Sequence, residues 1–68
     1  MERNEQINNR FLRIADVIGM TGLPKSTIYL KIKKNQFPSQ VPIGERSVAW
    51  VENEIQEWIK NNIQRRVD

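Results

Sequence analysis

Apolar residues along the chain change their spacing, and this change predicts helices at both ends with strands between them. One face of a first helix is marked by four residues at i, i+3, i+4 and i+7, namely Ile14, Val17, Ile18 and Thr21. We predict that this helix stops at Gly22, because glycine readily adopts the left-handed backbone that follows a helix C-terminus.

A second helix of about ten residues is expected directly after this stop. Pro24 suits the first helical position, since its missing N–H has no intrahelical partner there. Ile28 and Ile32 give the helix a buried face, and residues 35–38 (Asn-Gln-Phe-Pro) close it. A helix this short does not persist alone in water, so packing on the first helix must hold it.

Residues 39–50 alternate between apolar and polar positions, which predicts two strands. Val41 and Ile43 precede the turn at 44–46 (Gly-Glu-Arg), and Val48 and Trp50 follow it, so the segment is typical of a β-hairpin. Pro42 lacks a backbone N–H and therefore favours an edge position for the first strand. Residues 11–13 (Phe-Leu-Arg) are expected to form a short extended segment before the first helix.

The last predicted element is a helix with a clear apolar stripe. Its members recur at i, i+4, i+7, i+8 and i+12, and they are Val51, Ile55, Trp58, Ile59 and Ile63. Acidic residues crowd its first turns and Arg65 and Arg66 its last, which suits the helix dipole at both ends. Both Trp50 and Trp58 are expected in the core, because each buries a large aromatic area.

These elements define the fold class. The order helix, turn, helix, hairpin, helix predicts a mainly α protein with a small β-hairpin, a winged helix-turn-helix. We expect a flexible N-terminal tail at residues 1–9 and one DNA-binding domain at residues 10–68.

Composition narrows the function classes. The chain has 68 residues with no Cys and no His, which rules out disulfides and Cys-based metal sites and removes the commonest general base. No catalytic motif is present, so we expect a protein that is not an enzyme and needs no cofactor. The sequence also lacks a secretory signal and a membrane-spanning run, which predicts a cytoplasmic, nucleoid-associated location.

Charge is distributed unevenly along the chain, although the net charge is only +3. Residues 17–44 hold four Lys and no acidic residue, whereas residues 45–63 hold four Glu against Arg46 and Lys60. A basic region beside an acidic helix favours a polyanionic partner on one side of the molecule. Lysines that serve only solubility are the alternative, but these would be mixed with Glu.

Double-stranded DNA is the partner that this pattern favours, with the second helix entering the groove. With Ile28 and Ile32 placed at the core, a step of 100° per residue directs Ser26, Leu30 and Lys33 outward. The candidate DNA contacts on the helix and the hairpin are Lys25, Ser26, Thr27, Tyr29, Lys33, Lys34, Arg46 and Ser47.

Each candidate contact also has a structural alternative. Ser26 and Thr27 either donate to phosphates or cap the first helical turn. Tyr29 either contacts DNA or packs against the wing, and the lysines neutralise phosphates or simply face solvent. Arg46, at the hairpin tip, is expected to reach a minor groove or a phosphate strand.

Several spaced blocks resemble one known family. The blocks are residues 11–13, 21–29 (Thr-Gly-Leu-Pro-Lys-Ser-Thr-Ile-Tyr), 37–38, 44–50 (Gly-Glu-Arg-Ser-Val-Ala-Trp) and 57–59. Together they resemble the AlpA family of phage and prophage regulators, over roughly residues 10–64. The resemblance implies a winged helix-turn-helix related to the MerR and excisionase groups. The family often has a basic residue at the position of Leu30.

The resemblance also implies the function classes to be compared. The first is a sequence-specific regulator of transcription, often of integrase or prophage genes. The alternative is an excisionase, or recombination directionality factor, that organises attachment-site DNA and docks an integrase. A pure protein-interaction module, contacting a recombinase or RNA polymerase through the acidic last helix, is the weaker option. Self-association on DNA would extend the small interface of one such domain.

Overall fold

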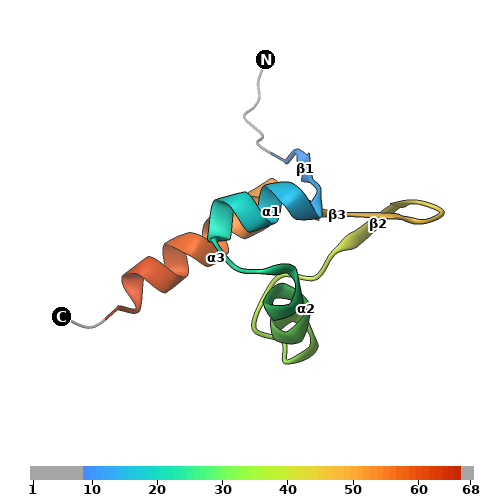
Figure 1. The fold of residues 1–68 in the computed structure, drawn as a ribbon. Helices are drawn as coiled ribbons and strands as arrows, with labels where there is room; N and C mark the ends of the chain where they lie inside the picture. Colours follow the sequence, from blue (N-terminus) through green and yellow to red (C-terminus); the bar gives the residue numbers. More distant parts are fainter. Residues whose placement is uncertain (1–8, 67–68) are drawn as a thin grey trace, which may run out of the picture.

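The computed structural model describes residues 9–66, which form helices and a small antiparallel sheet (Figure 1). The elements in chain order are β1 (Phe11–Leu12), α1 (Ile14–Thr21), α2 (Lys25–Lys33), β2 (Val41–Gly44), β3 (Ser47–Val51) and α3 (Glu52–Gln64). This order confirms the predicted mainly α fold with a hairpin, of winged helix type. The tail predicted at residues 1–9 lies outside the described residues except for Asn9, which is exposed.

The sheet has the strand order β1-β3-β2, with both pairs antiparallel. β2 and β3 form the predicted hairpin, and β2 is an edge strand, which is the position expected from Pro42. On the other side of β3, Leu12 pairs with Trp50 and Phe11 with Val51. The extended segment near residue 11 is therefore part of the sheet, which its sequence did not indicate.

Both ends of α1 are fixed by local hydrogen bonds. At its start the Asp16 Oδ2 accepts the Arg13 backbone N–H at 3.1 Å, as an acidic residue in the first turn often does. At its end Gly22 has φ +76° and donates its N–H to the Ile18 carbonyl at 2.8 Å. The prediction that α1 stops at Gly22 is confirmed.

The start of α2 differs by one residue from the prediction. Pro24 has φ −68° and ψ 159°, so it is the extended residue before the helix, and Lys25 occupies the first helical position. The φ of a proline suits both the cap position and the first helical position, and only ψ shows which of the two the residue occupies. At the other end Asn35 has φ +60°, while the Gln36 N–H donates to Lys31 O at 2.7 Å in a Schellman arrangement.

The core lies where the inner faces of the three helices meet the sheet. Its buried members are Leu12, Val17, Ile28, Phe37, Trp50 and Ile55. Trp50 is fully buried, as predicted, and its indole N–H donates to Pro38 O at 3.1 Å. Ile32 is only half-buried at the edge of this cluster, so Ile28 is the main anchor of α2.

α3 begins later and packs less completely than its apolar stripe suggested. Val51 belongs to β3, and the helix starts at Glu52. Ile63 is 52% exposed, and the C-terminal turns of α3 extend away from the sheet and α1 (Figure 1). Arg65 caps the end of the helix, so Arg65 and Arg66 follow its last turn and do not belong to it.

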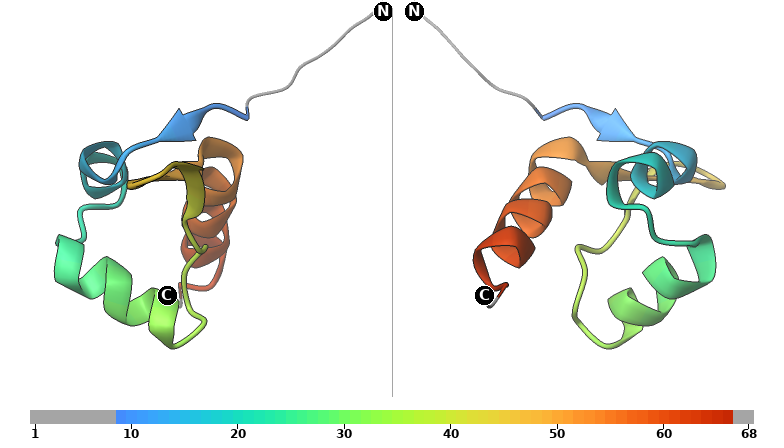
Figure 2. Two further views of the ribbon diagram at one scale, coloured as in Figure 1. Left: turned by 90° about the vertical axis from the view of Figure 1, so that its right-hand side faces the viewer. Right: turned by 60° about the vertical axis from the view of Figure 1, so that its left-hand side comes forward.

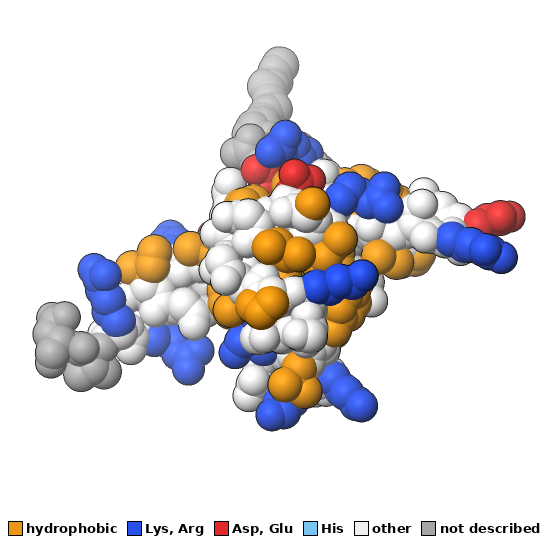
Figure 3. Space-filling view, in the orientation of Figure 1, with side chains coloured by type: hydrophobic (Ala, Val, Ile, Leu, Met, Phe, Trp, Pro, Cys, Tyr) orange, Lys and Arg blue, Asp and Glu red, His pale blue; other side chains and the backbone are white. Residues whose placement is uncertain are grey.

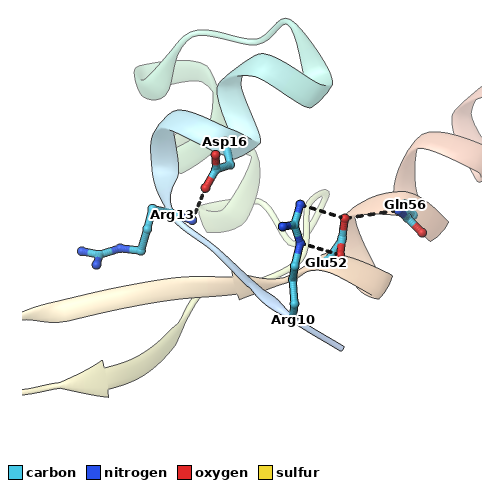
Figure 4. Close-up of polar contacts among 5 residues, drawn as sticks. All are labelled: Arg10, Arg13, Asp16, Glu52 and Gln56. Atoms are coloured by element: carbon cyan, nitrogen blue, oxygen red, sulfur yellow. Dashed lines mark hydrogen bonds and ion pairs between the residues drawn. The ribbon is translucent and has the colours of Figure 1, made fainter. Parts of the chain in front are cut away.

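A second set of contacts joins β1 to the start of α3 (Figure 4). The Glu52 N–H donates to Arg10 O at 2.8 Å, and the Arg10 Nε lies 2.9 Å from the Glu52 Oε1. The Arg10 side chain is 73% exposed, so this ion pair adds little stability. The backbone bond is the more important contact, since it continues the β1–β3 pairing into the helix.

Candidate nucleic-acid interface

The inner face of α2 holds this helix in a fixed orientation. Ile28 is completely buried, and the Tyr29 ring packs edge-on against Trp50 with centroids 6.0 Å apart. Trp50 is itself anchored in β3, so α2 rests against the same strand that forms the hairpin. Tyr29 is half-buried at this position.

The outer face of α2 carries the residues that a 100° step predicts. Ser26, Leu30 and Lys33 are all exposed, and Leu30 is 52% exposed. Lys34, which caps the helix, is exposed as well, whereas Lys31 is half-buried. Within residues 9–66, no α2 lysine lies within ion-pair distance of a carboxylate. Among the described residues, this face therefore presents lysine side chains around one exposed leucine.

The N-terminus of α2 lacks the protection that α1 has. Its cap residue is Pro24, which offers no side-chain acceptor, and its first turn contains no acidic residue. The first backbone N–H groups of a helix have no intrahelical partner, so here they remain open to an anion. Lys25 and Ser26 are exposed beside them, and Thr27 is half-buried. Lys25, Ser26 and Thr27 thus surround a helix end suited to a phosphate.

The hairpin ends in a two-residue turn of Glu45 and Arg46, both exposed. Ser47 pairs with Gly44 directly behind the turn and is half-buried. In the space-filling view, Lys and Arg side chains lie around α2 at the bottom and at the hairpin tip on the right, where an acidic side chain accompanies them (Figure 3). The tip of the hairpin therefore carries one negative side chain, Glu45, and one positive side chain, Arg46.

The hairpin and α2 border the same side of the molecule. In Figure 1 the hairpin extends to the right and α2 lies below it, and both views of Figure 2 keep α2 below the hairpin. In these views α2 and the hairpin therefore form one corner of the fold.

One further exposed cation, Arg13, was not among the predicted contacts. Arg13 immediately precedes α1, and its guanidinium points away from Asp16, in the direction in which the hairpin extends (Figure 4). Asp16 bonds the Arg13 backbone N–H and leaves the side chain free of that carboxylate. A lone arginine between a strand and a helix gives no periodic signal, so only the fold places it here.

The described part of the chain offers neither a metal site nor a membrane span. Residues 9–66 contain no group of three or more acidic side chains arranged to hold a metal ion. None of the helices in this range has the length and apolar character needed to span a bilayer.

Comparison with known proteins identifies the family. The sequence model of "Prophage CP4-57 regulatory protein (AlpA)" matches residues 10–63. The chain is 44% identical over 57 residues to the protein ORF88 of Enterobacteria phage P4, a match that covers 84% of this chain and 65% of ORF88. It is 41% identical over 56 residues to the DNA-binding transcriptional activator AlpA of Escherichia coli strain K12, covering 74% of this chain and 80% of that protein.

The match to ORF88 leaves about a third of the phage protein outside the aligned region. The family model, in contrast, spans every element from β1 to α3. It therefore covers both sides of the corner formed by α2 and the hairpin. The chain belongs to the AlpA family of prophage regulatory proteins.

Proposed function

We propose that this protein is a sequence-specific double-stranded DNA-binding protein that regulates transcription in the manner of AlpA. In this proposal α2 enters the major groove, and the hairpin contacts the adjacent backbone or minor groove. The relative from Escherichia coli is named a DNA-binding transcriptional activator, which supports the same class of function here. Excision at attachment-site DNA, the alternative role, would use the same surface.

The observation that carries the proposal is the acid-free helix α2 beside the hairpin. A helix that only packed against the core would be free to carry Glu on its outer face, as α3 does. α2 instead combines exposed Lys25, Lys33 and Lys34 with an uncapped N-terminus. Phosphates of one DNA strand are the ligands that both features favour.

The residues divide by the contact that we assign to them. Lys33, Lys34 and Arg46 neutralise phosphates, which fixes position but not sequence. Ser26, Thr27 and Tyr29 lie near the N-terminal half of α2, where hydrogen bonds and ring contacts to base edges are made. Lys25 and Ser47 support these contacts from the start of α2 and from the base of the turn. In this proposal, the preference for a particular DNA sequence depends on the uncharged residues Ser26, Thr27 and Tyr29.

Salt dependence of DNA binding tests the proposal. Lys33→Ala and Arg46→Ala are each expected to reduce the slope of log affinity against log salt by about 0.9, since each removes one phosphate contact. Fluorescence anisotropy with a duplex at several salt concentrations measures this slope.

The matched control for this experiment is Lys60→Ala, which removes the same charge from an exposed position on α3. It should leave the slope unchanged. An unchanged slope in Lys33→Ala and Arg46→Ala as well would reject the assignment of this surface to DNA.

A further inference from the structure

An open groove of about 860 Å³ runs along α3. Lys31 of α2 borders it, in a smaller adjoining hollow that it shares with Trp58 and Arg65. One wall is the segment from Asn35 to Val41, and the other is one face of α3. Trp58 of α3 joins the two walls. Its indole N–H donates to Gln36 O at 2.9 Å, and its ring packs edge-on against Phe37 with ring centroids 4.8 Å apart. The groove therefore has an aromatic floor and a polar rim.

The face of α3 that lines this groove is a regular stripe. Glu54, Trp58 and Asn61 of α3 and the C-cap residue Arg65 recur at i, i+4, i+7 and i+11, and all of them line the groove. Glu54 lies at the N-terminal end of the stripe and Arg65 at its C-terminal end, about 17 Å apart along the helix. Lys60 is on the far side of α3 and does not line the groove. Opposite charges thus mark the two ends of one exposed face.

This charge order makes the face complementary to itself. When two such helices run antiparallel with the midpoint between Ile59 and Lys60, Glu54 of each copy meets Arg65 of the other. In the same register Trp58 meets Asn61, so every pair occurs twice about a twofold axis. A parallel arrangement would instead place like charges together at both ends, and such contacts are unfavourable.

We propose that this groove is a self-association surface, occupied by α3 of a second copy of this chain in the antiparallel register. None of the proposed DNA contacts on α2 or the hairpin lines the groove, and the α2 lysine that borders it, Lys31, is not one of them. A dimer formed in this way is therefore expected to leave the proposed DNA contacts accessible. A single helix pair makes a small interface, which predicts weak and reversible association. The two copies would then strengthen each other on neighbouring DNA sites through their effective concentration.

Charge reversal tests this register. Sedimentation velocity over a wide range of protein concentration is expected to show a reversible dimer for the unmodified chain. Glu54→Arg and Arg65→Glu each turn two attractive pairs into repulsive ones, and each should lower the association constant at least about tenfold. The double variant restores both pairs and should recover association. Lys60→Glu, on the far side of α3, is the control and should associate normally.

A cross-linking experiment checks the geometry independently of stability. The chain contains no cysteine, so Asn61→Cys introduces one thiol near the proposed twofold axis and Lys60→Cys one on the opposite side of α3. Under mild oxidation, Asn61→Cys is expected to form a disulfide-linked dimer much faster than Lys60→Cys. Circular dichroism verifies that each variant is folded.

Three outcomes would overturn the proposal. The first is an unmodified chain that stays monomeric at the highest concentration tested. The second is a double charge variant that fails to recover association although it is folded. The third is equal cross-linking of the two cysteine variants. DNA binding measured on the same samples is a separate readout, so a failure here does not affect the function proposed above.

Discussion

Gly22 and Asn35 have a left-handed backbone conformation, and they follow the C-terminal ends of α1 and α2. Gly22 closes α1 at φ +76°, and Asn35 closes α2 at φ +60°. Asparagine tolerates this region better than other residues with a Cβ, because its short side chain can hydrogen-bond locally. Together these two positions set where α2 starts and where the chain turns toward the hairpin.

Two alanine substitutions separate conformational strain from packing at this scale. A Cβ at Gly22 would meet no atom within 4 Å, so Gly22→Ala is expected to cost about 1–2 kcal/mol of unfolding free energy through its positive φ alone. Gly19 lies inside α1 and also has open space around it. Gly19→Ala should therefore stabilise the protein by about 0.5–1 kcal/mol.

Urea unfolding followed by circular dichroism measures both changes. Equal effects of the two substitutions would show that the backbone at Gly22 is not the constraint on α1.

Residue type explains which of these features the sequence could predict. Gly22 was predictable, because glycine after a periodic apolar face is a common stop signal. The role of Asn35 depends on hydrogen bonds from Asn35 and Gln36 back into α2, which form only once the turn exists. The packing of Tyr29 on Trp50 joins residues far apart in sequence, so no local pattern indicates it.

At the scale of elements, the two-residue strand β1 contributes one residue to the hydrophobic core. Leu12 is 1% exposed and belongs to the core, whereas its neighbour Phe11 is 56% exposed. This alternation arises because successive side chains of a strand point to opposite faces. β1 is thus a strand because it pairs with β3, and its own sequence is too short to specify that.

Alanine scanning of β1 should reproduce this alternation. Leu12→Ala removes a fully buried side chain and is expected to cost about 2–5 kcal/mol. Phe11→Ala removes a larger but exposed side chain and should change stability by less than about 0.5 kcal/mol. A domain of this size has only about 3–10 kcal/mol in total, so the leucine variant should be close to unfolding.

Thermal unfolding of the two variants distinguishes these outcomes. A larger loss for Phe11→Ala than for Leu12→Ala would contradict the register in which β1 pairs with β3.

The other element boundaries show where periodicity succeeds and where it fails. The apolar spacing located α1, α2, the hairpin and α3, because each element buries one face. The apolar spacing assigned Val51 to the last helix, although Val51 is the last residue of β3. An apolar residue at the end of a strand can also match the spacing of the apolar face of the helix that follows. The spacing also gave Ile63 a place on the buried face, although α3 extends beyond the atoms that would cover it.

At the scale of the whole molecule, the acidic residues are distributed unevenly between surfaces. The α2 side carries lysines with no acidic residue, whereas Glu54 and Glu57 line the groove along α3. Uneven charge along the sequence indicated two regions, but their separate surfaces could be seen only in the fold. Glu45 is the exception, since it lies beside Arg46 at the hairpin tip.

Neutralising single glutamates tests this separation. Glu45→Gln removes a negative charge from the proposed DNA-facing corner and should increase DNA affinity about two- to fivefold at moderate salt. Glu57→Gln makes the same chemical change in the α3 groove and should leave affinity for a duplex with a single binding site nearly unchanged. Anisotropy titrations with one duplex give both values, and equal gains would show that only net charge matters.

The pairing of Leu12 with Trp50 also determines when this protein can fold during synthesis. Nearly forty residues separate the partners, so most of the chain must leave the ribosome before the sheet can close. α2, which lies between them, has no completed core to rest on until then. A nascent chain arrested before β3 has emerged should therefore remain sensitive to protease throughout, although the whole of α2 has already been synthesised.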